Sequence, residues 1–131
     1  MSASFARVAP GDLVWITRPH HEGEPARHVA ELSDAIRLAH SRANIWRYEP
    51  GAKGRRHRHP EQEETFVVLS GELTMYLGDP PQRVDVPAGG VINVRAGTPL
   101  QTVNHGNSDL LIYAHGHPPE DQHAQILDSA V

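Results

Sequence analysis

The sequence predicts an all-β fold, a sandwich or a barrel, formed by one domain. Short apolar segments rich in β-branched residues recur about every eight to twelve residues, and turn-forming residues separate them. Eleven glycines and eleven prolines are scattered along the chain rather than clustered, as many tight turns require. A chain of 131 residues buries roughly two thirds of its unfolded surface, which is enough for a single core.

The first third of the chain is predicted to hold strands at residues 13–17, 27–32 and 43–48. The first of these lies at the barrel edge or crosses to a partner subunit. Residues 33–39 carry candidate N-caps and helix formers but are too short for an independent helix, so we expect one helical turn or an outer strand. Trp46 and Tyr48 share one face of their strand, and we expect Trp46 to pack in the core rather than stack on a ligand.

The remainder of the chain is predicted to alternate strands with short turns. The expected strands are the one that carries His57 and His59, followed by residues 63–69, 72–77, 82–86, 91–94, 100–104 and 109–115. A Pro-Pro pair then ends the pattern. The tail is expected to form a short helix at residues 124–127 or to be disordered.

Two histidines and a glutamate are the most informative cluster in the sequence. His57 and His59 are two residues apart, so on a strand both side chains point the same way, with Cα atoms roughly 6.5 Å apart. Glu64 begins the next strand after a bend at Pro60, because proline lacks the N–H group that a central strand needs. Two imidazoles and one carboxylate are a donor set typical of a divalent-metal site.

The residues around this cluster form a longer pattern. Gly51, His57, His59, Glu64 and Gly71 follow the spacing G-x5-H-x-H-x4-E-x6-G. This spacing resembles the first signature motif of the cupin family.

The second cupin motif has a partial counterpart here. Gly89, Gly97 and Asn104 fit it, whereas Arg95 replaces its proline and Leu100 stands where the family's last metal histidine is expected. The resemblance implies a double-stranded β-helix, a jelly-roll barrel, with short N- and C-terminal extensions. It implies a single cupin domain over residues 1–131, with the barrel core at about 43–115, an N-terminal arm at 1–42 and a C-terminal tail at 116–131. It also implies a homodimer, formed as barrels pair through their sheets.

The resemblance places a small-molecule pocket inside the barrel. Its expected metal ligands are His57, His59 and Glu64, and its expected wall residues are Phe66, Leu100, Thr102 and Tyr113. Strand parity points Gln101 out of the pocket, and His115 is the reserve candidate for a fourth ligand. The expected metal is Fe, Mn, Ni or Zn, with no organic cofactor.

Three classes of function remain open from the sequence. The first is a metal-dependent oxygenase or isomerase acting on a small organic acid or sugar-like molecule. The second is a metal-poor, non-enzymatic domain of the same fold that binds or senses a ligand, and the third is a structural or regulatory partner without pocket chemistry. The sequence singles out no separate acid, base or nucleophile beyond the candidates Glu63 and Tyr113, so whether the protein is an enzyme stays open.

Composition excludes several other classes. The chain has no cysteine, so disulfides, thiolate metal sites and a cysteine nucleophile are excluded. A net charge of −4 argues against a dedicated nucleic-acid binder. The N-terminus lacks the pattern of a secretory signal and no apolar run approaches the roughly 20 residues that span a bilayer, so we expect a cytoplasmic protein without membrane contact.

Overall fold

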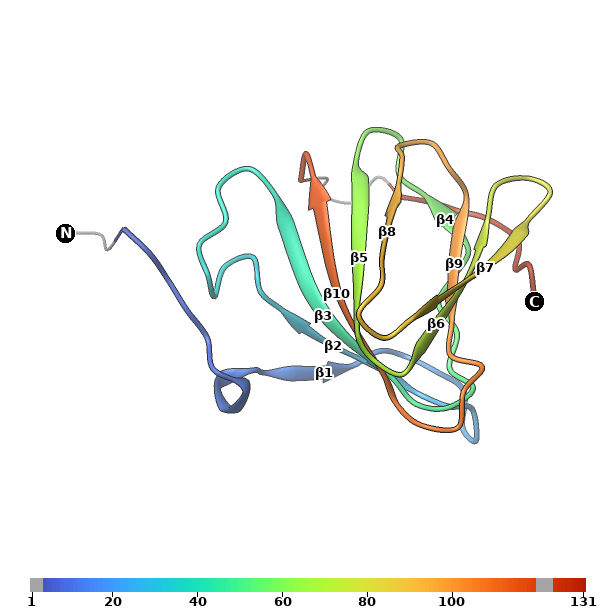
Figure 1. Ribbon diagram of the computed structural model, residues 1–131, viewed down its shortest axis with the longest axis horizontal. Helices are drawn as coiled ribbons and strands as arrows, with labels where there is room; N and C mark the ends of the chain where they lie inside the picture. The colour runs from blue at the N-terminus through green and yellow to red at the C-terminus, as the bar shows by residue number, and fades with distance from the viewer. Residues whose placement is uncertain (1–3, 120–123) are drawn as a thin grey trace.

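The computed structural model describes residues 4–119 and 124–131, which form two antiparallel β-sheets wrapped into a barrel (Figure 1). The larger sheet has the strand order β1-β2-β3-β10-β5-β8 and the smaller sheet the order β11-β4-β9-β6-β7. The elements are a 3₁₀ turn (Pro10–Asp12), β1 (Trp15–Thr17), β2 (Arg27–Glu31), β3 (Arg42–Tyr48), β4 (His57–Arg58), β5 (Glu63–Ser70), β6 (Glu72–Leu77), β7 (Gln82–Pro87), β8 (Val91–Val94), β9 (Leu100–Val103), β10 (Leu110–His117) and β11 (Gln125–Ile126).

The all-β prediction is confirmed. Neighbouring strands come from distant parts of the chain, since β3 pairs with β10 and β4 pairs with β9, which is the jelly-roll arrangement of a double-stranded β-helix. The predicted strands β1 to β3 and β5 to β10 each agree with the structure to within two residues at either end. The part of the chain that the structure describes contains no α-helix.

The short predicted segments have different outcomes. Residues 33–37 form turns, with one hydrogen bond of the α-helical kind from Ile36 N–H to the Leu32 carbonyl, which agrees with the expected single turn. Arg37 has a φ of 57°, which ends the right-handed conformation there. In the tail, the expected helix at 124–127 is wrong: Gln125–Ile126 forms β11, which pairs with β4. The free edge of β4 offers backbone groups to the tail, and such tertiary pairing overrides local helix propensity.

The core lies between the two sheets and fixes which face of each strand points inward. Leu73, Met75, Leu110 and Ile112 are almost completely buried, and each such side chain contributes roughly 1.5–3 kcal/mol relative to exposure. On β10, Ile112 lies opposite Trp46 of β3. Because strand side chains alternate, every second residue of β3, β5 and β10 faces the interior of the barrel.

A glycine brings the loop before β4 against the barrel wall. A Cβ atom at Gly54 would lie 2.7 Å from Thr102 Oγ1 and 3.1 Å from the Tyr48 hydroxyl, so only glycine allows this approach. Gly54 N–H donates to the Thr102 carbonyl, and the Gln101 amide donates to the Gly54 carbonyl. The loop is thereby fixed just before His57 and His59.

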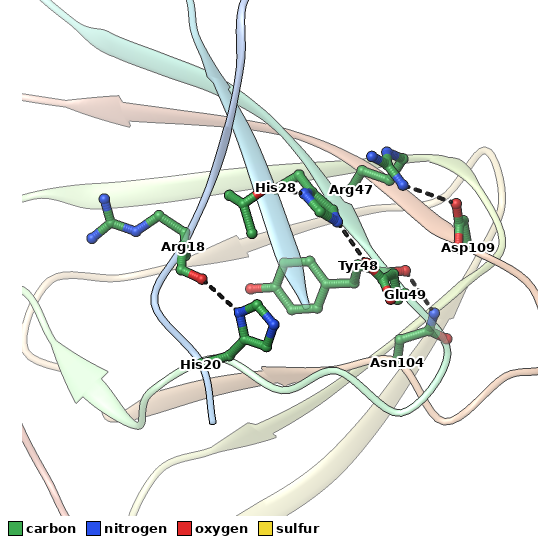
Figure 2. A network of polar contacts seen from close by, with 9 residues as sticks. Arg18, His20, His28, Arg47, Tyr48, Glu49, Asn104 and Asp109 are labelled. Carbon is green, nitrogen blue, oxygen red and sulfur yellow. Dashed lines mark hydrogen bonds and ion pairs between the residues drawn. The ribbon is translucent and has the colours of Figure 1, made fainter. Parts of the chain in front are cut away.

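Asn104, a residue of the second motif, has a structural role. Its side-chain amide donates to the backbone carbonyl of Tyr48 (Figure 2). The same amide donates to the Ser108 carbonyl, and Asn104 Oδ1 accepts from Gly106 N–H. These three bonds join the end of β3 to the turn between β9 and β10. Asn104 is 1% exposed, and each of its bonds satisfies a polar group that burial would otherwise leave unpaired.

Candidate metal centre

Three side chains from neighbouring segments meet at one point. His57 lies on β4, His59 follows the end of that strand, and Glu64 is the second residue of β5, after the bend at Pro60. One donor atom from each of the three lies within 4.8 Å of the other two. His57 Nε2 is 3.2 Å from His59 Nε2, which in turn is 3.5 Å from Glu64 Oε1.

These spacings fit a shared divalent ion. Two ligand atoms that each lie about 2.1 Å from one ion are about 3.0 Å apart at an octahedral angle and about 3.4 Å apart at a tetrahedral angle. The separation of 3.2 Å lies within that range and the separation of 3.5 Å lies just above it. The third pair of donor atoms lies within 4.8 Å, so the donors must draw slightly closer together to share one ion. The His59 and Glu64 side chains are 11% and 18% exposed, so both point into a partly desolvated space.

A backbone hydrogen bond sets the tautomer of His57. Its Nδ1 lies 2.8 Å from the Arg55 carbonyl oxygen, and because a carbonyl only accepts, Nδ1 carries the proton. The neutral ring therefore directs the lone pair of Nε2 toward His59 and the shared point. This arrangement, one ring nitrogen bound to a carbonyl and the other free to coordinate, is the usual support of a metal-binding histidine.

The surroundings keep His57 neutral. Burial lowers the pKa of His57 below its ordinary value, and the nearby charges of His59 and Arg27 lower it further, against the opposing effects of the Arg55 carbonyl and the Glu64 carboxylate. Metal ligation requires the neutral imidazole. The lowered pKa therefore makes His57 competent to bind a cation over a wider pH range.

Leu100 stands beside this cluster. The register of β4 and β9 places it directly opposite His57, and it is 2% exposed. A histidine at this position would reach the same point, whereas leucine presents an apolar wall. Within the described ranges, no fourth histidine, cysteine or acidic residue joins the three donors.

A cavity of about 300 Å³ opens next to the three donors. Of the pocket residues expected from the sequence, Phe66, Leu100 and Thr102 line it. The Thr102 hydroxyl is paired with the hydroxyl of Tyr48 at 2.6 Å, in a buried position. Trp46 packs against the core as expected and also forms part of the cavity wall, with its ring edge-to-face with Tyr48 at 5.9 Å.

Tyr113 does not line the cavity, which corrects its expected placement. Ile112 faces the cavity, so the alternation of β10 turns Tyr113 and His115 to the outer face of the larger sheet, where their rings stack 6.4 Å apart. His115 is therefore not a fourth ligand of this centre. Glu63 is exposed and lies on the opposite side of β5 from Glu64, so neither proposed acid–base candidate faces the cavity.

Gln101 points away from the cavity, in the expected direction. It is nevertheless buried, because the C-terminal tail covers it: Ala130 N–H donates to its side-chain oxygen at 2.8 Å, and its amide lies 3.0 Å from the Ser129 hydroxyl. The tail thus seals the outer side of β9.

Several residues that sequence reasoning missed also line the cavity: Arg18, Arg27, Arg42, Asn44, Tyr48, Arg55, Ile112, Ala124 and Ile126. Arg58 follows His57 on β4 and so points to the opposite face, where it donates to Gln125 of the tail. The sequence gave no signal for Arg27, because the direction of its side chain depends on the pairing of β2 with β3.

A polar network on the outer face holds the strand next to the cavity mouth (Figure 2). His28 lies 2.9 Å from the Thr17 hydroxyl through Nδ1 and 2.7 Å from a Glu49 carboxylate oxygen through Nε2. Arg18 N–H donates to the Arg27 carbonyl. These contacts join β1, β2 and the end of β3, and so position the segment that follows β1 over the cavity.

No helix among the described residues is both long and apolar enough to cross a membrane. No protein of curated function is similar enough in sequence to count as a relative of this chain.

Solved structures share the fold. A predicted oxalate decarboxylase from Thermotoga maritima is 21% identical with a TM-score of 0.74, over 86% of this chain and 99% of that one. A sugar phosphate isomerase of the cupin superfamily from Silicibacter pomeroyi is 24% identical with a TM-score of 0.73, over 86% and 76%. An uncharacterized double-stranded β-helix protein from Klebsiella pneumoniae is 23% identical with a TM-score of 0.65, over 86% and 90%.

Sequence comparison agrees with the fold and with the first motif. The model of the cupin domain matches residues 44–122, which is more than half of the chain and includes the three donor residues. The protein therefore belongs to the cupin family.

Proposed function

We propose that this protein is a metal-binding cupin that acts on a small organic acid or sugar-like molecule held in its barrel. The observation that carries the proposal is the convergence of His57, His59 and Glu64 within 4.8 Å, with the His57 tautomer set for coordination. A bound divalent ion would supply a Lewis acid and a template for ligand oxygen atoms. Fe, Mn, Ni and Zn all suit this donor set, which leaves coordination positions open for such oxygens.

Similar structures support the ligand class. They include the sugar phosphate isomerase and predicted oxalate decarboxylase named above, and oxalate oxidase in complex with glycolate. The reaction classes that fit the donor set are isomerisation and oxygenation. In both, the apolar wall formed by Trp46, Phe66 and Ile112 excludes water on one side of the ligand, and Asn44 offers it an amide.

The second candidate function is a ligand-binding or sensing cupin without catalysis. Two observations favour it. Leu100 removes the fourth ligand, and among the described cavity residues the acid–base groups other than the three donors are limited to Tyr48, whose hydroxyl is already paired with Thr102. Under this candidate, the donor residues serve chiefly as hydrogen-bonding groups.

Titration of the metal-stripped protein with Fe(II), Mn(II), Ni(II) and Zn(II), followed by calorimetry, tests the first proposal. We expect each chain to bind one ion, and we expect this binding to be lost when His57 and His59 are both replaced by alanine. His115→Ala is the matched control, since it removes a histidine from the outer face and should leave binding unchanged. If none of the four ions binds the parent protein, the metal proposal is wrong and the metal-poor candidate takes its place.

We also propose that the partner of this chain is a second copy of itself. The register of the larger sheet aligns a row of apolar residues across its outer face, in the order Trp15, Ala30, Ile45, Tyr113, Val67 and Val91. Val91 and the adjacent Leu69 are 60% and 47% exposed. The segment before β1 extends away from the barrel and carries Phe5 and Val14, both 76% exposed (Figure 1). Pairing of two such faces would bury this surface.

A further inference from the structure

Four arginine side chains line the cavity beside the metal centre: Arg18, Arg27, Arg42 and Arg55. Glu64 is the one carboxylate among the described residues of the same wall. Guanidinium groups gathered around a cavity of about 300 Å³ repel one another, and a bound divalent ion would add to the positive charge. The cavity is therefore electrostatically complementary to an anion.

Among the described residues, no acceptor pairs with the guanidinium groups of these four arginines, unlike those of other arginines. Over residues 4–119 and 124–131, no ion pair or hydrogen bond is formed by the guanidinium groups of the four. By contrast, Arg47 pairs with Asp109, Arg58 donates to Gln125 and Arg83 pairs with Asp85. The donors around the cavity remain available to a ligand.

Arg27 is held in place by aromatic rings rather than by an acid. Its guanidinium carbon lies 5.3 Å from the ring centre of Trp46 and 5.8 Å from that of Tyr48. Stacking of this kind orients the planar group while leaving the N–H donors at its edge open. The charge of Arg27 also contributes to the lowered pKa of His57, after burial and His59, so its field reaches the metal centre.

Two of the arginines stand where the cavity opens. Arg27 and Arg55 also line an outer groove of about 710 Å³, and Gly54 and Ile126 are likewise common to both spaces. Among the described residues of the groove, Glu24 is the one acidic residue, against several basic ones. A predominantly positive entrance concentrates anions at the opening and speeds their entry.

We propose that Arg27 and Arg55 form an oxyanion-binding subsite at the mouth of the cavity, which takes a carboxylate or phosphate group of the ligand. The inference rests on the proposed function, in which the other polar end of the ligand lies at the metal centre. The fork of arginine donors binds two oxygens of either group at once. Arg18 adds positive charge from the segment after β1. Arg42 lies at the start of β3, roughly 20 Å along the strand from Tyr48, and so belongs to the opposite end of the cavity.

This subsite defines the ligand class. A molecule that carries an anionic group at one end and polar oxygens at the other satisfies both sites, and a neutral sugar satisfies the metal centre alone. Without a bound anion, the guanidinium groups of Arg27 and Arg55 repel each other. Neutral analogues leave this repulsion in place and therefore bind more weakly than anionic ligands.

Anion binding to the metal-free protein tests the inference separately from the metal. The protein is stripped with a chelator, dialysed free of it, and titrated by calorimetry with inorganic phosphate, with malonate and, as the neutral probe, with glycerol. We expect phosphate or malonate to bind and glycerol not to bind, and the stronger of the two anions identifies which oxyanion the subsite prefers. Arg27→Gln and Arg55→Gln should each weaken that anion about tenfold or more, whereas Arg95→Gln, an exposed loop arginine, should leave it unchanged.

Arg27→Lys keeps the charge and separates recognition from simple attraction. A partial loss of anion affinity with lysine and a larger loss with glutamine supports a two-point contact between the guanidinium group and the anion. Both variants must retain the parent's circular dichroism spectrum. Absence of anion binding to the parent, or equal weakening by Arg95→Gln, overturns the inference. The parent protein distinguishes the two proposals: metal binding without anion binding refutes the subsite alone, and anion binding without metal binding refutes the metal centre alone. Arg27→Gln should keep the parent's metal binding.

Discussion

Replacing Leu100 by histidine tests whether the ion binds next to Leu100, the apolar residue beside the three donors. Leu100 lies directly opposite His57 in the β4–β9 pair, where Cβ atoms are about 4.5–5.5 Å apart. An imidazole at this position can turn its Nε2 toward the point shared by the three donors. The variant should therefore bind Zn(II) or Mn(II) more tightly than the parent, by about tenfold or more, which corresponds to about 1.4 kcal/mol or more.

The same substitution should weaken the metal-free protein. Leu100 is 2% exposed, and its burial contributes roughly 1.5–3 kcal/mol. An imidazole buried without a partner costs roughly 1–3 kcal/mol more. We therefore expect the metal-free variant to lose about 2.5–6 kcal/mol of unfolding free energy, and the added metal to restore part of it.

Thermal unfolding with and without metal, combined with calorimetric titration, measures both effects. Leu77→His is the matched control: Leu77 pairs with Leu100 on the far side from His57, so its imidazole starts about 10 Å from His57 and should add no affinity. If Leu100→His folds but binds no more tightly than the parent, or if Leu77→His gains as much, the proposed position of the ion is wrong.

Three further predictions follow from the packing, the charges and the outer face. Gly54→Ala should cost about 1–3 kcal/mol in chemical denaturation, because its Cβ would meet Thr102 Oγ1 at 2.7 Å, whereas Gly11→Ala meets nothing within 4 Å and should be neutral. Since folding lowers the pKa of His57, the metal-free protein should lose stability as pH falls below about 6.5, and His57→Gln should flatten that slope; an unchanged slope contradicts the assignment. Light scattering should show a dimer that Val67→Asp converts to a monomer, and a monomeric parent refutes the outer-face pairing.

Sequence alone predicted most strands and the three donors because both depend on local spacing. Alternating apolar residues between turn signals locate the strands without knowledge of their partners. His57 and His59 share a direction on any extended chain, and the bend at Pro60 returns Glu64 toward them. The convergence of the three therefore needed little tertiary information.

The features that the sequence did not predict depend on pairing between segments that are distant in the chain. Both faces of β10 carry apolar residues, so alternation alone does not say whether Ile112 or Tyr113 faces inward; the contact of Ile112 with the barrel core decides it. Arg27 reaches the cavity only because β2 pairs with β3 in a register that sets it opposite Tyr48. The strand Gln125–Ile126 forms because β4 has a free edge, a feature that exists only in the folded barrel.

The central claim is that two imidazoles and one carboxylate meet on a single ion inside the barrel. X-ray absorption spectroscopy of the protein loaded with one equivalent of Zn(II) examines that meeting point directly. We predict a first shell with two imidazole nitrogens and oxygen donors, which His57→Ala changes to one imidazole. A shell without imidazole, or a spectrum that His57→Ala and His59→Ala leave unaltered, would contradict the account.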